Sequence, residues 1–338
     1  MFSLAPSGGV KNLILLGNQL RERGYEVVFY VAEAEGEFPL QYANECELVY
    51  APPARRGVFK RIYWLSRVDS DAAVAIATFY PTAFAVWLNK SPFRKRVYYI
   101  QAYEVLFYRW PMLRVIRRAN LMLLAQLSYF LPLDQVVNCK GSALGIFPRS
   151  RRNRAVEIPQ GINLDIYKPE SREQKRVRIG HLSRPAKWKG SAEVFQAMRV
   201  LREEIGADFD LVIAYDLCPD TCGLEYEVHK PETEQELANF YSSCDIVISS
   251  GYGQGTGYPF LESRASGAIC FATDSEGGTP YVDYIPIKRG DVQSIVDAFI
   301  WYRGNPEKIP AMIQAGLKTV SAYGWDEVMQ GWVEVVKS

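Results

Sequence analysis

The stretch SSGYGQGTGYPFLESRASG, which runs from Ser249 to Gly267, decides the fold of this chain. An unbroken apolar run that starts after Asp245 leads into it and is typical of a buried parallel strand. Glycines at positions 251, 253, 255 and 257 leave a loop where a ligand can approach the backbone closely. Pro259 fits the first turn of a helix that Gly267 ends. Together these elements favour a bound anion such as phosphate, because free N–H groups and the positive end of the helix dipole point at it.

The spacing inside this stretch resembles the Glu–seven residues–Glu signature of retaining glycosyltransferases with the GT-B fold, chiefly glycosyltransferase family 4. The family pattern reads roughly Glu-Gly-Phe-Gly-Leu-Pro-x-x-Glu, and this chain reads Gln254-Gly-Thr-Gly-Tyr-Pro-Phe-Leu-Glu262. Both glycines, the proline and the second glutamate match, whereas Gln254 stands in place of the first glutamate. A plain glycine-rich turn is the alternative interpretation of the loop alone, but the apolar strand at 268–273 continues the family pattern.

Length and composition describe an ordinary globular protein with room for two domains. The chain has 338 residues, of which 48% are hydrophobic and 23% are charged, as is typical of soluble domains. The net charge is +1, but residues 1–168 hold 22 basic and 13 acidic residues, whereas the remainder holds 17 and 25. A basic first half and an acidic second half predict different partners for the two.

Neither cysteine, histidine nor aspartate spacing predicts a metal site. The six cysteines show no metal-binding spacing, and Cys218 with Cys222 forms neither a redox nor a zinc motif. We interpret the cysteines as small buried apolar residues in a reducing compartment, which predicts a cytoplasmic protein. Two Asp-x-Asp pairs, at 69–71 and 208–210, precede strands and are interpreted as solvated turn residues, not as ligands of the metal-dependent GT-A type. We therefore expect no metal and no cofactor.

Alternating strands and helices in the first half predict a doubly wound parallel sheet. Strands are expected at 26–31, 72–79, 96–102 and 135–139. An amphipathic helix is expected after the Gly8-Gly9 loop, and the resemblance implies that this loop helps to bind the donor. Family members usually have several more residues before this point, so we expect the first strand to be truncated, as by a late start codon assignment.

A polar segment with Gln101, Tyr103 and Glu104 ends the strand expected at 96–102. Family members often carry a Gln-Asp-Tyr-Glu-like run here that faces the reacting sugar, and Ala102 takes the place of the aspartate. The resemblance implies that Glu104 is a catalytic carboxylate on the acceptor side. A structural hydrogen-bonding role is the alternative.

Basic and aromatic residues are interleaved between Phe93 and Arg118, in the sequence FRKRVYYIQAYEVLFYRWPMLRVIRR. This mixture suits an anionic membrane surface, or a partly buried helix whose arginines extend to water. We predict peripheral contact with the inner face of a membrane, and a solvated protein face is the alternative. No nucleic-acid-binding motif is present, so nucleic acid is not an expected partner.

The segment Ile158–Pro169 resembles the family's interdomain segment, and its proline and glycine residues suit a hinge. The expected domains are an acceptor-side domain at 1–165, a donor-nucleotide domain at 166–320, and a helix at 321–338 that packs back on the first domain. Each of the two domains is expected to be Rossmann-like, and the two are expected to face a cleft.

Basic residues follow the strand expected at 177–183. In the family, an arginine and a lysine at this place hold the donor's diphosphate, and Lys189 matches the lysine. His181 occupies the arginine position by strand register, so the resemblance gives the arginine's role to Arg184. Further on, the segment 226–231 resembles the short strand whose backbone contacts the nucleotide base.

The resemblance implies a retaining glycosyltransferase of polysaccharide biosynthesis that moves a sugar from a nucleotide-sugar donor to a glycan, lipid-linked or small-molecule acceptor without metal. Gln254 is a neutral amide and cannot act as a carboxylate nucleophile. This favours a same-face mechanism in which the leaving phosphate helps to deprotonate the acceptor. The expected catalytic residues are Gln254, Lys189, Arg184 and Glu104. The expected donor-binding residues are Gly8, Gly9, His181, Lys189, Arg184, Val228, Gly255, Thr256, Gly257, Tyr258 and Glu262.

Two other functions compete with this one. A non-catalytic GT-B protein that binds a nucleotide sugar and partners an active transferase is favoured by the departures at Gln254, Ala102 and His181. An NAD-dependent oxidoreductase is disfavoured, because a G-x-G-x-x-G motif starting at Gly253 would need glycine where the chain has Tyr258.

Overall fold

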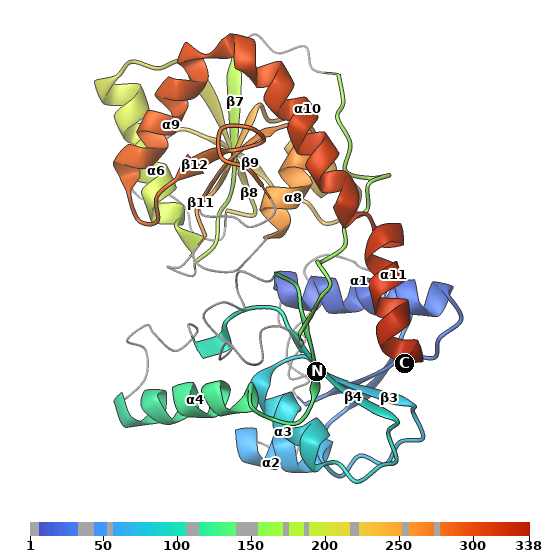
Figure 1. Ribbon diagram of the computed structural model, residues 1–338. Coiled ribbons are helices and arrows are strands. Elements are labelled where there is room, and N and C mark those ends of the chain that lie inside the picture. Colours follow the sequence, from blue (N-terminus) through green and yellow to red (C-terminus); the bar gives the residue numbers. More distant parts are fainter. Residues whose placement is uncertain are drawn as a thin grey trace. The chain divides into compact units, whose positions relative to one another are not determined.

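Two units, each built on parallel sheet structure, make up the protein in this computed structural model (Figure 1). Unit 1 holds residues 1–161 and 326–338, and unit 2 holds residues 162–325. The structure describes residues 7–32, 44–52, 57–105, 115–139, 155–171, 176–185, 189–216, 223–251, 257–273 and 278–338, apart from the side chains of 115–118.

Unit 1 has a four-stranded parallel sheet in the order β3-β4-β5-β6 and a separate parallel pair, β1-β2. Its strands are β1 (Val28–Val31), β2 (Glu47–Tyr50), β3 (Val74–Ala77), β4 (Lys95–Ile100), β5 (Asp134–Val137) and β6 (Val156–Glu157). Its helices are α1 (Gly8–Glu22), α2 (Val58–Leu65), α3 (Tyr80–Leu88), α4 (Val115–Ser128) and α11 (Trp325–Lys337). The central strand β4 is buried from Val97 to Ile100, as expected for a strand covered on both faces.

The last helix, α11, packs against the central strand of unit 1. Its Trp332 is 1% exposed, and the ring meets Tyr99 of β4 edge to face with centroids 4.8 Å apart. Arg94 adds a hydrogen bond of 2.8 Å from its guanidinium to the carbonyl oxygen of Val336. The C-terminal helix is therefore part of the core of unit 1.

Unit 2 has a six-stranded sheet in the order β12-β11-β10-β7-β8-β9, with every neighbouring pair parallel. Its strands are β7 (Val177–Leu182), β8 (Phe209–Ala214), β9 (Glu227–His229), β10 (Ile246–Ser249), β11 (Ile269–Thr273) and β12 (Ile285–Ile287). Its α-helices are α6 (Ser191–Arg199), α7 (Glu234–Ser242), α8 (Tyr258–Ala265), α9 (Val292–Gly304) and α10 (Ile309–Val320). A π-helical turn continues α6 at Val200–Glu204, and two 3₁₀ turns lie at Pro306–Lys308 and Ser321–Tyr323.

The order of these strands contains a switch point between β7 and β10. The chain leaves β7 toward β8 and β9, and it then returns to the other side of β7 to form β10 and β11. The loops that follow β7 and β10 therefore diverge, and in open parallel sheets ligands bind in the crevice that such divergence leaves at the carboxyl ends of the strands.

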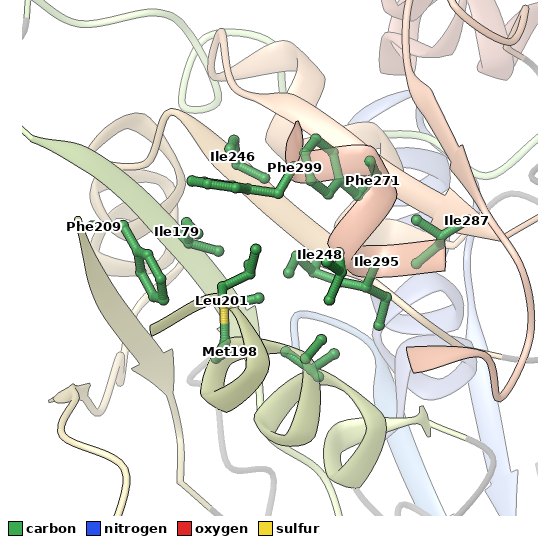
Figure 2. Packing of buried hydrophobic residues seen from close by; sticks show 14 of the residues in the cluster. Ile179, Met198, Leu201, Phe209, Ile246, Ile248, Phe271, Ile287, Ile295 and Phe299 are labelled. Carbon is green, nitrogen blue, oxygen red and sulfur yellow. The ribbon is translucent and has the colours of Figure 1, made fainter. Parts of the chain in front are cut away.

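The core of unit 2 lies between the sheet and the helices α6 and α9 (Figure 2). Ile179 of β7 and Ile246 of β10 pair in register, and both are fully buried. Met198 of α6 and Phe299 of α9 pack in the same cluster. This packing holds the central strands, and hence their carboxyl ends, in one fixed arrangement.

Several features predicted from the sequence have clear positions. Four cysteines, at 46, 139, 244 and 270, are buried, as predicted, and Cys218 and Cys222 lie outside the described residues. Asp208 and Asp210 form ion pairs with Arg176 at 3.0 and 3.6 Å, at the amino end of β8. Within the described ranges, no helix has the length and apolar character needed to cross a bilayer.

Candidate functional site

The switch point of unit 2 gathers four of the eleven residues predicted to bind a donor. Arg184 and Lys189 follow β7, and Glu262 lies in α8 after β10. The predicted residues Gln254, Gly255 and Thr256 lie outside the described residues.

His181 of β7 is a buried link between the sheet and the loop that follows. It is 2% exposed, with Nδ1 2.9 Å from the carbonyl oxygen of Ile248 and Nε2 3.0 Å from the Ser191 hydroxyl. A carbonyl oxygen can only accept, so Nδ1 holds the proton and Nε2 accepts from the hydroxyl. Burial lowers the pKa of His181 to about 4, against the hydrogen bond to Ile248, which raises it.

This geometry revises the expected role of His181. Both ring nitrogens are used inside the protein, and the neutral ring supplies no charge for a phosphate group. Ser191 connects the ring to the predicted cation, because its hydroxyl oxygen accepts from the backbone N–H of Arg184 at 3.0 Å. His181 is therefore placed to orient the loop that holds Arg184.

Lys189 and Arg184 concentrate positive charge at the carboxyl end of β7. Burial lowers the pKa of the Lys189 ammonium to about 8, and the neighbouring Arg184 guanidinium lowers it further in the same direction. The backbone of Lys189 is fixed, since its carbonyl oxygen accepts from the Ser250 hydroxyl at 2.9 Å. The next residue, Gly190, has φ 72° and no room for a side chain, because a Cβ there would lie 2.5 Å from Ser250 Oγ. An anion bound here would relieve the repulsion between the two cations.

Tyr215, which the sequence did not single out, supports Arg184. The guanidinium carbon lies 4.5 Å from the centre of the tyrosine ring, within cation–π distance. Tyr215 and the next residue, Asp216, have φ values of 71° and 45°, a left-handed backbone that costs about 1–3 kcal/mol at each such residue. A backbone hydrogen bond of 2.7 Å from Tyr215 to His229 helps to hold this turn in place.

Glu262 lies inside unit 2, one turn into α8. It is 1% exposed, and its carboxylate lies near the hydroxyl group of the fully buried Tyr241. Burial and the Glu262 carboxylate raise the pKa of Tyr241 well above its usual value. Glu262 is thus paired, inside unit 2, with a tyrosine that the sequence gave no reason to select.

Helix α8 is anchored at its other end by a buried ion pair. Arg264 is 1% exposed and donates to Asp283 at 3.0 Å, with its guanidinium 3.9 Å from the centre of the Phe260 ring. Thr319 donates to the same carboxylate at 2.8 Å, so α10 shares the anchor. Removing one member of a buried ion pair lowers folding stability by about 3–5 kcal/mol. The pair therefore holds α8 in its position.

The remaining predicted residues of unit 2 lie at the edges of this site. Gly257 is the N-cap of α8, and Tyr258 is the first residue of the helix and 6% exposed. Val228 lies in the edge strand β9 and is 40% exposed. The N-terminus of α8 follows the carboxyl end of β10, where the helix dipole favours an anion, although Pro259 has no N–H and the N–H of Phe260 donates to the carbonyl oxygen of Gly257 at 3.0 Å.

Gly8 and Gly9 belong to unit 1, where they begin α1 after the N-cap Ser7. A Cβ on Gly9 would lie 3.4 Å from the amide oxygen of Gln101, at the carboxyl end of β4. Asn12, another residue that the sequence did not single out, donates to that same oxygen at 3.2 Å. These residues form a separate polar group within unit 1.

Glu104 is buried in unit 1 and holds α3. It is 2% exposed, and Oε2 accepts from the backbone N–H of Tyr80 at 2.7 Å and from the Tyr98 hydroxyl at 3.0 Å. Burial raises the pKa of Glu104 to about 8, although both hydrogen bonds lower it. Because Tyr80 is the first residue of α3, this geometry matches the structural alternative weighed for Glu104 and not an exposed acceptor-side carboxylate.

Among the residues that the structure describes, no group of three or more His, Cys, Asp or Glu side chains could hold a metal ion.

The sequence matches no family model and no curated protein. Solved structures with the same fold nevertheless cover nearly the whole chain. Sucrose-phosphate synthase from Thermosynechococcus elongatus matches with a TM-score of 0.78 and 14% identity, over 98% of this chain and 93% of its own. The HepE protein of Anabaena in complex with UDP-glucose matches with a TM-score of 0.75 and 16% identity, over 100% and 98%. A glycosyltransferase from Rickettsia africae matches with a TM-score of 0.70 and 13% identity, over 98% and 95%. The chain therefore has the GT-B fold, which confirms the fold predicted from the sequence.

Proposed function

We propose that this chain is a glycosyltransferase that moves a sugar from a nucleotide-sugar donor to a glycan, lipid-linked or small-molecule acceptor. The observation that carries the proposal is the pair Arg184 and Lys189 at the switch point of unit 2, beside the N-terminus of α8. The whole-chain likeness to solved glycosyltransferases, one of them in complex with UDP-glucose, supports it.

The two cations would bind the diphosphate of the donor. Charge-assisted hydrogen bonds to phosphate are about twice as strong as neutral ones, and a partly buried site strengthens them further. The N–H groups at Gly257 and Tyr258 would share the negative charge, and Val228 would lie near the nucleotide base. Glu262 of α8 would accept hydrogen bonds from the donor ribose.

Sugar transfer would proceed with retention of configuration. As the bond from the sugar to the diphosphate breaks, Lys189 and Arg184 would stabilise the developing negative charge on the leaving group. The acceptor oxygen would bond to the anomeric carbon on the face that the diphosphate leaves, and a leaving phosphate oxygen would take the proton of the acceptor hydroxyl. Gln254 would hydrogen-bond the donor sugar, since a neutral amide cannot act as a carboxylate nucleophile.

The chemistry proposed for the leaving group needs no metal ion, because two side chains supply the positive charge. Transfer should therefore continue in EDTA. Loss of transfer in EDTA, with recovery on adding manganese, would contradict this part of the proposal.

We further propose that the protein acts in the cytoplasm in polysaccharide biosynthesis. Cys46 and Cys270, which are buried free thiols, support a reducing compartment. A lipid-linked acceptor would bring the protein to the inner face of a membrane.

A panel of UDP-, GDP-, ADP- and dTDP-sugars tests the proposed function, first by thermal shift and then by transfer with retention scored from the anomeric proton signals of the product. A donor that binds and is transferred or slowly hydrolysed supports it. A donor that binds without turnover would favour the non-catalytic nucleotide-sugar-binding protein, the alternative that Gln254 motivates. No shift with any donor would contradict both.

A further inference from the structure

Three neighbouring helices of unit 1 present large apolar side chains to solvent. Helix α3 lies against both α2 and α4 (Figure 1). Six apolar residues on these helices are at least 45% exposed: Phe59, Tyr63, Trp87, Leu88, Leu123 and Leu127. The outer surface that these six residues mark is the apolar-basic face.

Helix α2 is the clearest part of this face. None of its eight residues is buried, although six of the eight in VFKRIYWL are apolar or aromatic. Phe59 is 76% exposed and Tyr63, one helical turn later, is 51% exposed. Soluble proteins seldom leave such residues uncovered side by side unless the surface binds something.

Positive charge predominates on the apolar-basic face. The segments 58–71 and 80–91 contain four basic residues, at 60, 61, 67 and 90, and two acidic residues, Asp69 and Asp71, which follow α2. Arg67 lies 5.3 Å from the centre of the exposed Tyr63 ring. The combination of aromatic rings, aliphatic side chains and positive charge is typical of a surface that lies at a lipid headgroup layer.

The basic residues of the stretch predicted from the sequence are placed differently. Arg94 donates to the carbonyl oxygen of Val336, and Lys95 pairs with Ser338 and, at 3.9 Å, with Asp134. They bind other parts of unit 1, and most of the stretch after residue 105 lies outside the described residues. The surface that a partner could contact therefore lies on α2, α3 and α4, and not on Arg94 and Lys95 of the predicted stretch.

We infer that the apolar-basic face docks the protein onto an anionic lipid bilayer. A second copy of the chain fits the face less well, because pairing it with itself would bring like charges together. The inference rests on the proposed function in one respect, since a lipid-linked acceptor would lie in such a bilayer. Binding would place the rings of Phe59 and Tyr63 among the headgroups, with Lys60 and Arg67 against lipid phosphates.

Vesicle flotation of the full chain tests this inference, with phosphatidylcholine vesicles compared with vesicles that contain phosphatidylglycerol. The wild type should float with the anionic vesicles only, and less as salt is added, because each basic residue contributes about a fivefold gain in affinity at low salt. Phe59→Ser with Tyr63→Ser should reduce binding at least tenfold, and Lys60→Gln with Arg67→Gln should reduce it by a similar factor. Ile300→Ser is the matched control, since Ile300 is 50% exposed on α9 of unit 2.

Each outcome decides the inference. Equal flotation with both vesicle types, or loss of binding in the control variant alone, would overturn it. So would a wild type that ignores vesicles and forms a dimer that Phe59→Ser with Tyr63→Ser dissociates. Nucleotide-sugar thermal shift of every variant checks that unit 2 is intact, and it separates the two proposals, because vesicle binding can persist in a protein that binds no donor.

Discussion

Low pH should destabilise the folded state of unit 2, because the buried His181 resists protonation. This effect distinguishes a neutral histidine that positions the loop from a charged histidine that binds phosphate. The pKa of His181 is about 4 in the folded protein because the ring is buried, compared with 6.5 for an unperturbed histidine. Between these two values the unfolded chain binds the proton more readily than the folded one. The stability contributed by the neutral ring is therefore present above pH 6.5 and is lost as the pH falls toward 4.

The size of this effect follows from the two pKa values. Their difference corresponds to about 3 kcal/mol, of which about 2.5 kcal/mol is lost by pH 4.5. Glu104 in unit 1 acts in the opposite direction, since its pKa is raised to about 8 by burial. The useful quantity is thus the difference between the wild type and His181→Gln, in which Glu104 is unchanged.

Urea denaturation of both proteins at pH 7 and 4.5 measures this difference. His181→Gln cannot take up a proton, so its stability relative to the wild type should rise by about 2.5 kcal/mol on acidification. His229→Gln is the control, because His229 is partly exposed and bonded to Glu227. With only two histidines in the chain, His229→Gln also leaves a single imidazole NMR signal. A signal that titrates near pH 6.5, or a stability difference independent of pH, would refute this account of His181.

Three further predictions address single residues. Tyr215→Leu should weaken binding of a nucleoside diphosphate about two- to fivefold, by loss of the cation–π contact with Arg184, whereas Tyr215→Phe should not; equal affinities by calorimetry would contradict the contact. At pH 9, the free energy of unfolding of Glu104→Gln in urea should exceed that of the wild type by about 3–5 kcal/mol. The protonated carboxyl of the buried Glu104 contributes stability to the wild type below pH 4.5, and this contribution is lost as the pH rises through the folded-state pKa of about 8. Gln254→Ala should slow sugar transfer about tenfold or less, measured as kcat/KM, and an inert wild type that Gln254→Glu activates would favour the non-catalytic alternative.

The positions of the central strands in unit 2 were predictable from their short apolar segments. The expected strands at 177–183 and 245–249 correspond to β7 and β10; the apolar run Ile246–Ile248 of β10 is buried throughout, whereas Arg178 and His181 interrupt the apolar residues of β7. The resemblance of the glycine-rich loop pointed to the GT-B fold, which the solved structures confirm. Two other peripheral strands, β2 and β12, were not predicted: β2 has four residues, and β12 contains Pro286 at the edge of the sheet, where a missing N–H is tolerated.

The internal geometry of the site was not predictable from residue types. His181 was expected to contact the donor, but strand register alone cannot say which groups a buried ring meets across the sheet. Tyr215 gave no signal, since its left-handed backbone is rare for residues other than glycine. The exposure of α2 was also missed, because an apolar helix in a sequence is normally interpreted as core.

Calorimetry with UDP, or with the diphosphate of whichever base the donor panel selects, measures whether the donor diphosphate binds at the switch point of unit 2. Lys189→Ala should lose about ten- to hundredfold in affinity, as expected for a charge-assisted bond to phosphate worth about 1.5–3 kcal/mol. Lys318→Ala, at an exposed lysine of α10, should bind as the wild type does. The same loss is expected for the complete nucleotide sugar and for the diphosphate alone. Unchanged affinity of Lys189→Ala for both would contradict the placement of the donor diphosphate at the switch point of unit 2.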